Sequence, residues 1–247
     1  MLGIPDRIRA CLFDLDGVLT QTATVHAAAW KEMFDRFLRQ WAAEHGQPFV
    51  PFDPVTEYDK YVDGRSRADG TRTFLESRGI DLPEGSDADP LGAPTIAGLS
   101  ALKNQIVLRK IADDGVSVYP GSVRYLDAVA QAGLARAVVS ASANCRPVLA
   151  AAGLSDRFDV IVDGVVAKRD HLTGKPAPDT YLAGARLLGI PPSDGVVYED
   201  AQAGVQAGRA GDFGWVVGVD RAGQAAELRK AGANVVVKDL AELLDEA

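Results

Sequence analysis

The second half of the chain alternates apolar strand-like runs with helix-like segments, and this alternation constrains its fold more than any other feature. The strand-like runs lie at 135–142, 158–164, 194–200, 213–220 and 234–240. The helix-like segments lie at 145–154, 177–190, 201–211, 224–233 and 241–247. Short apolar runs separated by helices of this length predict a buried parallel sheet with crossover helices. The apolar run at 9–14 has the same character, so we expect a doubly wound α/β core that includes it.

Residues 22 to about 117 do not follow this alternation. A long helix is predicted at 26–46, because Trp30, Phe34, Phe37 and Trp41 recur at the spacing of one helical face. Two further helical stretches follow. Each is preceded by a loop rich in Pro, Gly and Asp, at 47–57 and at 81–98 respectively. We therefore predict two domains, which are an α/β core of residues 1–21 and 118–247 and an inserted helical domain of residues 22–117.

Composition excludes several classes of partner. The chain has 247 residues, is 47% hydrophobic and carries a formal net charge of −8, which argues against nucleic acid as its main ligand. No segment reaches the ~18 apolar residues of a membrane span, and the first ten residues lack a signal-peptide core. Cys11 and Cys145 are the only cysteines, which is typical of a reducing compartment. We expect a cytoplasmic protein without nucleic-acid or membrane partners.

Acidic and polar residues follow the predicted strands. Asp14 and Asp16 end the first run, Ser140 ends a second, and Glu199 and Asp200 end a third. Ligands of open α/β folds bind beyond the carboxyl ends of the strands, so these side chains are expected to share one edge. Clustered carboxylates favour a hard divalent cation such as Mg²⁺. Lys175, which precedes a predicted helix, and donors near Ser140 would hold an anion, which indicates phosphoryl transfer.

These segments resemble a known family. In order, "DLDGVLT", the serine of "VVSAS", the lysine of "GKPAPD" and the acids of "VVYED" are similar to the four motifs of the haloacid dehalogenase-like phosphotransferases. Within that superfamily, "TATVHAAAWK" and "YVDGRSRADG" resemble the β-phosphoglucomutase branch. The resemblance implies a Rossmann-like core, and it implies that the helical insertion is a cap domain.

The resemblance also implies roles for individual residues. Asp14 would be the nucleophile that forms an aspartyl-phosphate, and Asp16 would be the general acid/base whose carbonyl also contacts the metal. Asp200, with Glu199, would complete the Mg²⁺ site. The transferring phosphoryl group would be bound by Lys175, Ser140, Ala141 and Asn144. The family positions Asp16 and the sugar with residues that match Thr22, His26 and Trp30, and it binds the far phosphate with residues that match Gly64 and Arg67.

We therefore expect a monomeric Mg²⁺-dependent enzyme that acts on a small phosphorylated sugar. It would interconvert β-glucose 1-phosphate and glucose 6-phosphate through the 1,6-bisphosphate. One alternative is a phosphatase, in which water attacks the same phosphorylated Asp14. Asp63 keeps this alternative open, because mutases of this branch often carry lysine before the glycine that matches Gly64. A non-catalytic sugar-phosphate sensor is the second alternative, although a sensor needs no nucleophile.

Overall fold

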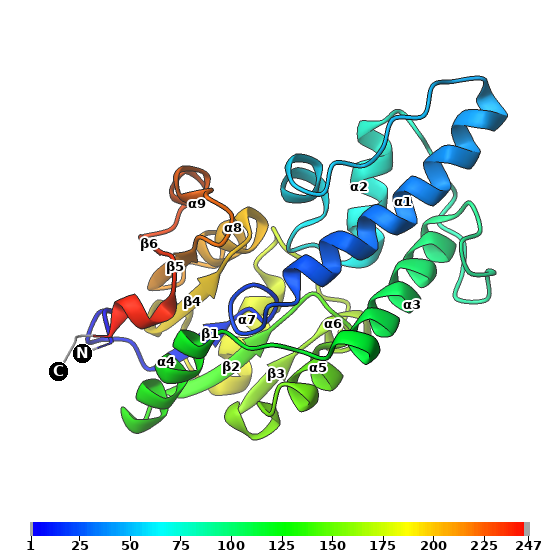
Figure 1. Cartoon of the computed structure of the whole chain (residues 1–247). Coiled ribbons are helices and arrows are strands. Elements are labelled where there is room, and N and C mark those ends of the chain that lie inside the picture. Colours follow the sequence, from blue (N-terminus) through cyan, green and yellow to red (C-terminus); the bar gives the residue numbers. More distant parts are fainter. Residues whose placement is uncertain (1, 245–247) are drawn as a thin grey trace. The chain divides into compact units, whose positions relative to one another are not determined.

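The chain forms two compact units (Figure 1). The structure, a computed structural model, describes residues 2–244. The first unit consists of Met1–Gln21 and Val116–Ala247, and the second consists of Thr22–Gly115. Residues 116 and 117, which the sequence analysis placed in the insertion, belong to the first unit. The reason is that Gln21 N–H donates to the Ser117 carbonyl at 2.8 Å, and Thr20 forms a β-bridge with Val118.

A parallel sheet forms the centre of the first unit. Within residues 2–244 it has six strands in the order β3-β2-β1-β4-β5-β6, and every neighbouring pair is parallel. The strands are β1 (Ala10–Phe13), β2 (Ala135–Val139), β3 (Val160–Val162), β4 (Gly195–Glu199), β5 (Trp215–Val219) and β6 (Val235–Val237). This sheet confirms the predicted α/β core. Strand order reverses at β1, which lies between β2 and β4 and therefore marks the usual ligand site of such folds.

Side chains of β1 point alternately to the two faces of the sheet. Because these side chains are apolar and buried, both faces are covered by helices. Ala10 and Leu12 share one core cluster with Tyr181 and Val205, whereas the Phe13 ring stacks on Tyr198 with centroids 4.4 Å apart. The helices of this unit are α4 (Pro120–Gln131), α5 (Cys145–Ala151), α6 (Gly164–Arg169), α7 (Asp179–Leu188), α8 (Gln202–Ala210) and α9 (Ala225–Ala231). Short 3₁₀ turns occupy Ser155–Arg157, Pro192–Asp194 and Leu240–Leu243.

The predicted C-terminal helix at 241–247 is wrong over its described part. The chain forms only the 3₁₀ turn Leu240–Leu243, and Leu244 is already extended, with φ −82° and ψ 126°. Leu240 and Leu243 are both buried, so one turn with three-residue spacing is enough to place both side chains in the core. Residues 245–247 of that prediction lie outside the described residues.

The second unit is helical and has its own core. Its helices are α1 (Ala23–His45), α2 (Arg67–Ser77) and α3 (Ile96–Asp114), with a π-helical turn at Tyr58–Val62. As its spacing predicts, α1 buries Trp30, Phe34 and Phe37 on one face. The helix ends at Gly46, whose φ of +62° is the left-handed conformation that glycine adopts without strain.

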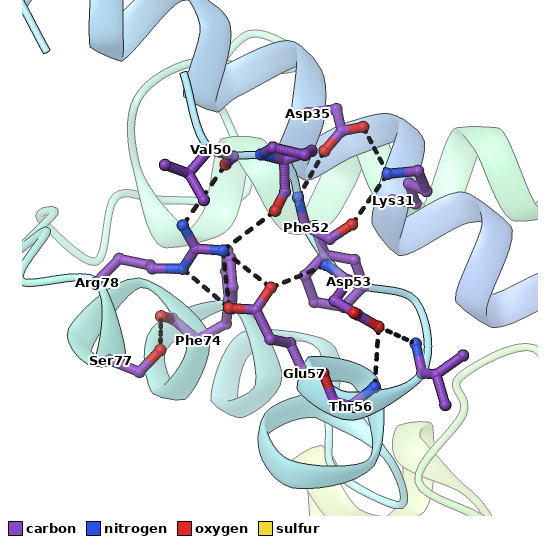
Figure 2. A network of polar contacts seen from close by, with 12 residues as sticks. Lys31, Asp35, Val50, Phe52, Asp53, Thr56, Glu57, Phe74, Ser77 and Arg78 are labelled. Atoms are coloured by element: carbon purple, nitrogen blue, oxygen red, sulfur yellow. Dashed lines mark hydrogen bonds and ion pairs between the residues drawn. The ribbon is translucent and has the colours of Figure 1, made fainter. Parts of the chain in front are cut away.

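Arg78 anchors the predicted loop 47–57 to this helical core (Figure 2). Its guanidinium donates to both carboxylate oxygens of Glu57 at 2.9 Å and to the Pro51 carbonyl at 3.2 Å. The same group lies over the Phe74 ring, 5.2 Å from its centroid. Asp35 of α1 accepts the Phe52 N–H at 2.8 Å. The loop is therefore a fixed part of the second unit, although residues 47–55 have no regular secondary structure.

Candidate active site

Three neighbouring strands place the predicted acids at one edge of the first unit. Asp14 follows β1, Ser140 follows β2, and Glu199 ends β4 with Asp200 directly after it. The side chains of all four residues are buried. Each carboxylate that is buried so deeply requires compensating charges or donors, because an unpaired buried charge is costly.

Lys175 supplies that compensation. It lies in the segment between α6 and α7, and only 3% of its surface is exposed. Its Nζ donates to Asp14 Oδ1 at 2.6 Å and to the Val139 carbonyl at 3.1 Å, and it lies 2.5 Å from Glu199 Oε1. An ammonium group has three protons, so these three acceptors satisfy it completely. Lys175 therefore links the ends of β1, β2 and β4.

The electrostatics of this group follow from burial and from the pairing. Burial raises the pKa of Asp14 well above its ordinary value, although the positive charge of Lys175 opposes this shift. Burial alone would lower the pKa of Lys175, but Asp14 and Glu199 outweigh it and the pKa is raised. The lysine is therefore held in its charged form beside the predicted nucleophile.

Asp14, Glu199 and Asp200 could also hold a metal ion. Each offers a carboxylate oxygen, and these oxygens lie within 4.8 Å of one another. An all-oxygen, carboxylate-rich set fits a hard divalent cation. Glu199 has a second function here, since its Oε1 accepts the Tyr181 hydroxyl at 2.8 Å in addition to contacting Lys175.

Two glycines make room for these acids. At Gly17, where φ is +88°, a Cβ atom would lie 1.6 Å from Asp200 Oδ2. At Gly204 of α8, a Cβ atom would lie 1.8 Å from Glu199 Oε1. Real side-chain contacts are never this short, so any larger residue at either position must displace the carboxylate or the main chain.

The segment after β2 folds on itself beside the acids. Ser140 Oγ accepts the Ser142 N–H at 3.1 Å, and Ser142 Oγ accepts the Asn144 N–H at the same distance. Ala141, between the two serines, approaches Gly164 so closely that a Cβ there would lie 2.7 Å from the Ala141 carbonyl oxygen. The predicted anion-binding residues thus lie in one compact turn, but their role in binding phosphate remains a prediction.

The other predicted residues lie in the second unit. Thr22 precedes α1 and is buried, and His26 Nδ1 lies 2.8 Å from Lys103 Nζ of α3. Trp30 is only 3% exposed and stacks on Phe34 with centroids 5.1 Å apart, so its ring is part of the hydrophobic core. The structure therefore gives Trp30 a packing function, and its predicted contact with the sugar stays a prediction.

Gly64 and Arg67 lie at the start of α2. Gly64 adopts a φ of +70°, and Arg67 is the first residue of the helix, after the N-cap Ser66. Burial lowers the pKa of Arg67, and within residues 2–244 its guanidinium has neither a hydrogen bond nor a carboxylate partner. A half-buried arginine without a partner is available to an anion, which keeps the prediction for Arg67 open.

Several residues of these clusters were not predicted. Tyr181 and Gly204 contact Glu199, Gly17 contacts Asp200, and Lys103 contacts His26. The proximity of Gly17 and Gly204 to the acids could have been inferred from the sequence. Gly17 directly follows Asp16, and Gly204 lies five positions after Glu199. Tyr181 and Lys103 carry no such signal, because both fit ordinary amphipathic helices.

A Gly204→Ala substitution is expected to impair the site without unfolding the protein. The new methyl group would displace the Glu199 carboxylate and with it Lys175, and a displacement of about 1 Å can cost ~100-fold in turnover. The measurement is kcat/KM for a phosphate ester, together with thermal unfolding. Gly208→Ala on the same helix is the matched control, because the three atoms nearest to its Cβ would be side-chain carbons of Val197 and Val216, at 3.1–3.3 Å. Equal activity of both variants would contradict the role given to Gly204.

Comparison with known proteins assigns this chain to a class of enzymes. A sequence model of the haloacid dehalogenase-like hydrolase family matches residues 8–212, and the chain belongs to this family. It is 55% identical to β-phosphoglucomutase of Mycobacterium bovis over 247 residues, which cover 99% of this chain and 94% of that protein. It is also 31% identical to hexitol phosphatase A of Escherichia coli, over 83% of this chain and 80% of that one.

Solved structures agree with this assignment. The structure of β-phosphoglucomutase from Clostridium difficile matches with a TM-score of 0.75 and 28% identity, over 96% of this chain and 94% of that chain. These relatives confirm the predicted family and show that the chain is an enzyme, either a phosphotransferase or a hydrolase, rather than a sensor. Among the described residues, no helix has the length and apolar character needed to span a membrane.

Proposed function

We propose that this enzyme is a β-phosphoglucomutase, which interconverts β-glucose 1-phosphate and glucose 6-phosphate through the 1,6-bisphosphate. The observation that carries this proposal is the buried Asp14–Lys175–Glu199 group, at the carboxyl edge of the sheet, in a chain that is 55% identical to an enzyme of that name. A mutase and a phosphatase both need this group, so the sugar specificity rests on the similarity.

The proposed cycle has two phosphoryl transfers. In the first, a carboxylate oxygen of Asp14 attacks the phosphorus, the bond from phosphorus to the sugar oxygen breaks, and Asp16 donates its proton to that oxygen. In the second, Asp16 takes a proton from a sugar hydroxyl, whose oxygen attacks the phosphorus and releases the Asp14 carboxylate. Proton transfer by a positioned acid typically contributes about 10²–10⁴-fold to such steps.

Mg²⁺ is the cation that the carboxylate set suits best. We propose that Asp14, Glu199 and Asp200 hold it together with the Asp16 carbonyl, and that Lys175, Ser140, Ala141 and Asn144 bind the transferring phosphoryl group. The cation, when bound, neutralises charge on the phosphoryl oxygens. Lys175 adds a fixed positive charge at Asp14, where the two anions would otherwise repel each other.

We further propose that the second unit recognises the sugar phosphate. Thr22, His26 and Trp30 would position Asp16 and the sugar, and Lys103 Nζ would hold the His26 ring from 2.8 Å. Gly64 and Arg67 would bind the phosphate that is not transferred, since a guanidinium can bind phosphate through two parallel hydrogen bonds.

Replacing Arg67 with Ala is expected to reduce activity on a bisphosphate much more than on a small monoester. A charge-assisted hydrogen bond is worth ~1.5–3 kcal/mol, or roughly one to two decades in kcat/KM. The measurement compares kcat/KM for glucose 1,6-bisphosphate and for a monoester without a second phosphate. Arg78→Ala is not a suitable control, because Arg78 anchors a loop. Arg109→Ala is suitable, because Arg109 forms an exposed ion pair with Glu32. Equal losses on both substrates would show that Arg67 does not bind the second phosphate.

A phosphatase acting through the same aspartyl-phosphate is the second candidate. It is favoured by the 31% identity to hexitol phosphatase A and by the acidic Asp63 beside Gly64. One assay separates the two functions. β-Glucose 1-phosphate is supplied with Mg²⁺ and a trace of the bisphosphate, and glucose 6-phosphate and free phosphate are measured together. A mutase yields glucose 6-phosphate with little free phosphate, whereas release of phosphate at the rate of substrate loss would favour the phosphatase.

We also propose that the enzyme is a cytoplasmic monomer. Cys11 and Cys145 are free and buried, as expected in a reducing compartment. Size-exclusion chromatography with light scattering tests the monomer, and a dimer at micromolar concentration would contradict it.

A further inference from the structure

The segment between β5 and α9 donates hydrogen bonds to both acid-bearing segments of the first unit. Arg221 Nε donates to the Gly17 carbonyl at 2.9 Å, and Gln224 Nε2 donates to the Asp200 carbonyl at 3.0 Å. The segment is itself ordered by Asp220, whose Oδ1 accepts the N–H groups of Gly223 and Gln224 at 2.7 and 2.8 Å. Residues 220–224 are therefore ordered themselves and hold the main chain at Gly17 and Asp200 through hydrogen bonds.

The Arg221 guanidinium is held from several sides. Its carbon lies 3.5 Å from the centroid of the Tyr119 ring, and its NH1 nitrogen donates to the Lys238 carbonyl at 2.6 Å. The same nitrogen lies 3.4 Å from Asp239 Oδ2, and only 17% of the side chain is exposed. A planar guanidinium fixed in this way loses little entropy when it forms one more hydrogen bond.

The Gly17 carbonyl is a critical acceptor, because Gly17 directly follows Asp16. Its N–H donates to the Thr20 carbonyl at 2.8 Å and its carbonyl accepts from Arg221, so both peptide groups of Gly17 are fixed. At the left-handed φ of +88° a Cβ atom would lie 1.6 Å from Asp200 Oδ2, so no other residue fits this position without a shift. The direction of the chain at Asp16 therefore depends on how Gly17 is held.

We propose that Arg221 is a positioning residue for Asp16, acting through the Gly17 carbonyl. This inference rests on the proposed function, in which Asp16 is the general acid/base. Without the Arg221 hydrogen bond, the turn after Asp14 can rotate. The Asp16 carboxyl group is then correctly placed to protonate the leaving oxygen in only a fraction of the enzyme–substrate complexes. Asp14 is affected less, because Lys175 and the end of β1 hold it independently.

A leaving-group comparison detects this function specifically. A sugar oxygen is a poor leaving group and needs the proton of Asp16, whereas p-nitrophenolate needs almost none. Arg221→Met should therefore slow phosphorylation of Asp14 by glucose 1,6-bisphosphate about tenfold to a hundredfold, but phosphorylation by p-nitrophenyl phosphate less than about threefold. Arg221→Lys keeps one donor and should fall between the wild type and Arg221→Met.

The experiment measures the rate of phosphoenzyme formation with each donor in the wild type, in both Arg221 variants and in Asp16→Asn. Arg7→Met is the matched control, because Arg7 also donates to a glycine carbonyl, that of Gly214, at 2.8 Å, but away from the acids. Thermal unfolding shows whether each variant is folded. If Arg221→Met does not fold, the comparison of the two donors is made with Arg221→Lys.

Each outcome separates the two claims. A selective loss on the bisphosphate in the Arg221 variants and in Asp16→Asn supports the inference. Equal losses on both donors in the Arg221 variants, with a selective loss in Asp16→Asn, overturn the role of Arg221 and leave the proposed function intact. Equal losses in Asp16→Asn would overturn the acid/base role of Asp16, and the inference about Arg221 with it.

Discussion

Replacing Asp14 with Asn is expected to abolish turnover and phosphoenzyme formation, with a loss of at least about four orders of magnitude. Asp14 lies at the end of β1, with its Oδ1 2.6 Å from Lys175 Nζ. An amide is nearly the same size but cannot serve as the nucleophile, and it is a weaker metal ligand. The measurement combines steady-state turnover with detection of an acid-stable phosphoryl group on the intact protein.

The fold of this variant should survive, because the amide removes one of the two carboxylates that contact Lys175 and leaves Glu199 in place. Circular dichroism and thermal unfolding check this point. Asp163→Asn is a suitable comparison, since Asp163 is a buried strand-end acid of the same sheet that caps α6 through the Val166 N–H at 2.9 Å. Turnover by Asp14→Asn within tenfold of the wild type would remove Asp14 from the mechanism.

Replacing Lys175 with Met is expected to lower both turnover and stability. The substitution leaves the buried Asp14 and Glu199 without their shared cation, and breaking a buried ion pair in this way typically costs ~3–5 kcal/mol in the free energy of unfolding. Loss of a fixed positive charge at the reacting group should also reduce kcat about a hundredfold to a thousandfold. Chemical denaturation and steady-state kinetics measure the two effects separately.

A double variant distinguishes the two functions of Lys175. Adding Glu199→Gln to Lys175→Met removes one of the unpaired carboxylates, so a large part of the lost stability should return, which a double-mutant cycle quantifies. Activity should not return, because catalysis needs the charge itself. A Lys175→Met variant as stable as the wild type would contradict the pairing seen in the structure.

The edge of the sheet could be predicted from the sequence because parallel strands impose it. Asp14, Ser140 and Glu199 each follow an apolar run, and such runs in a doubly wound sheet end at the same edge. Lys175 lies in a loop and has no periodic signal of its own; its position just before a predicted helix indicated an anion-binding role, and the motif resemblance then supported it. The sequence did not reveal that Lys175 contacts three strand ends at once.

Two helices of the first unit were not predicted. The segment of α4 carries a clear signal, with Pro120 at its first position and an apolar face that includes Leu126 and Val129. In contrast, α6 spans only Gly164–Arg169, which is too short for helical periodicity, and the Asp163 cap is its main local signal.

Long-range contacts explain the site residues that the sequence did not reveal. Lys103 and His26 are 77 positions apart, and Arg221 is 204 positions from Gly17. Lys103 lies within an amphipathic helix and Arg221 within a polar turn, and both contexts are ordinary for a solvated residue. Only the packing of α1 against α3, and of residues 220–224 against the segment that follows β1, brings these side chains to their partners.

The most direct test of the mechanism identifies the residue that carries the phosphoryl group. The enzyme is mixed with Mg²⁺ and glucose 1,6-bisphosphate, quenched in acid within the first turnover, and treated with borohydride, which reduces an acyl phosphate to an alcohol. Peptide mass spectrometry then locates the modified residue. We predict homoserine at position 14 and no modification of Asp16, Glu199 or Asp200. Modification of another residue, or rapid turnover with Asp14 never modified, would contradict the aspartyl-phosphate mechanism.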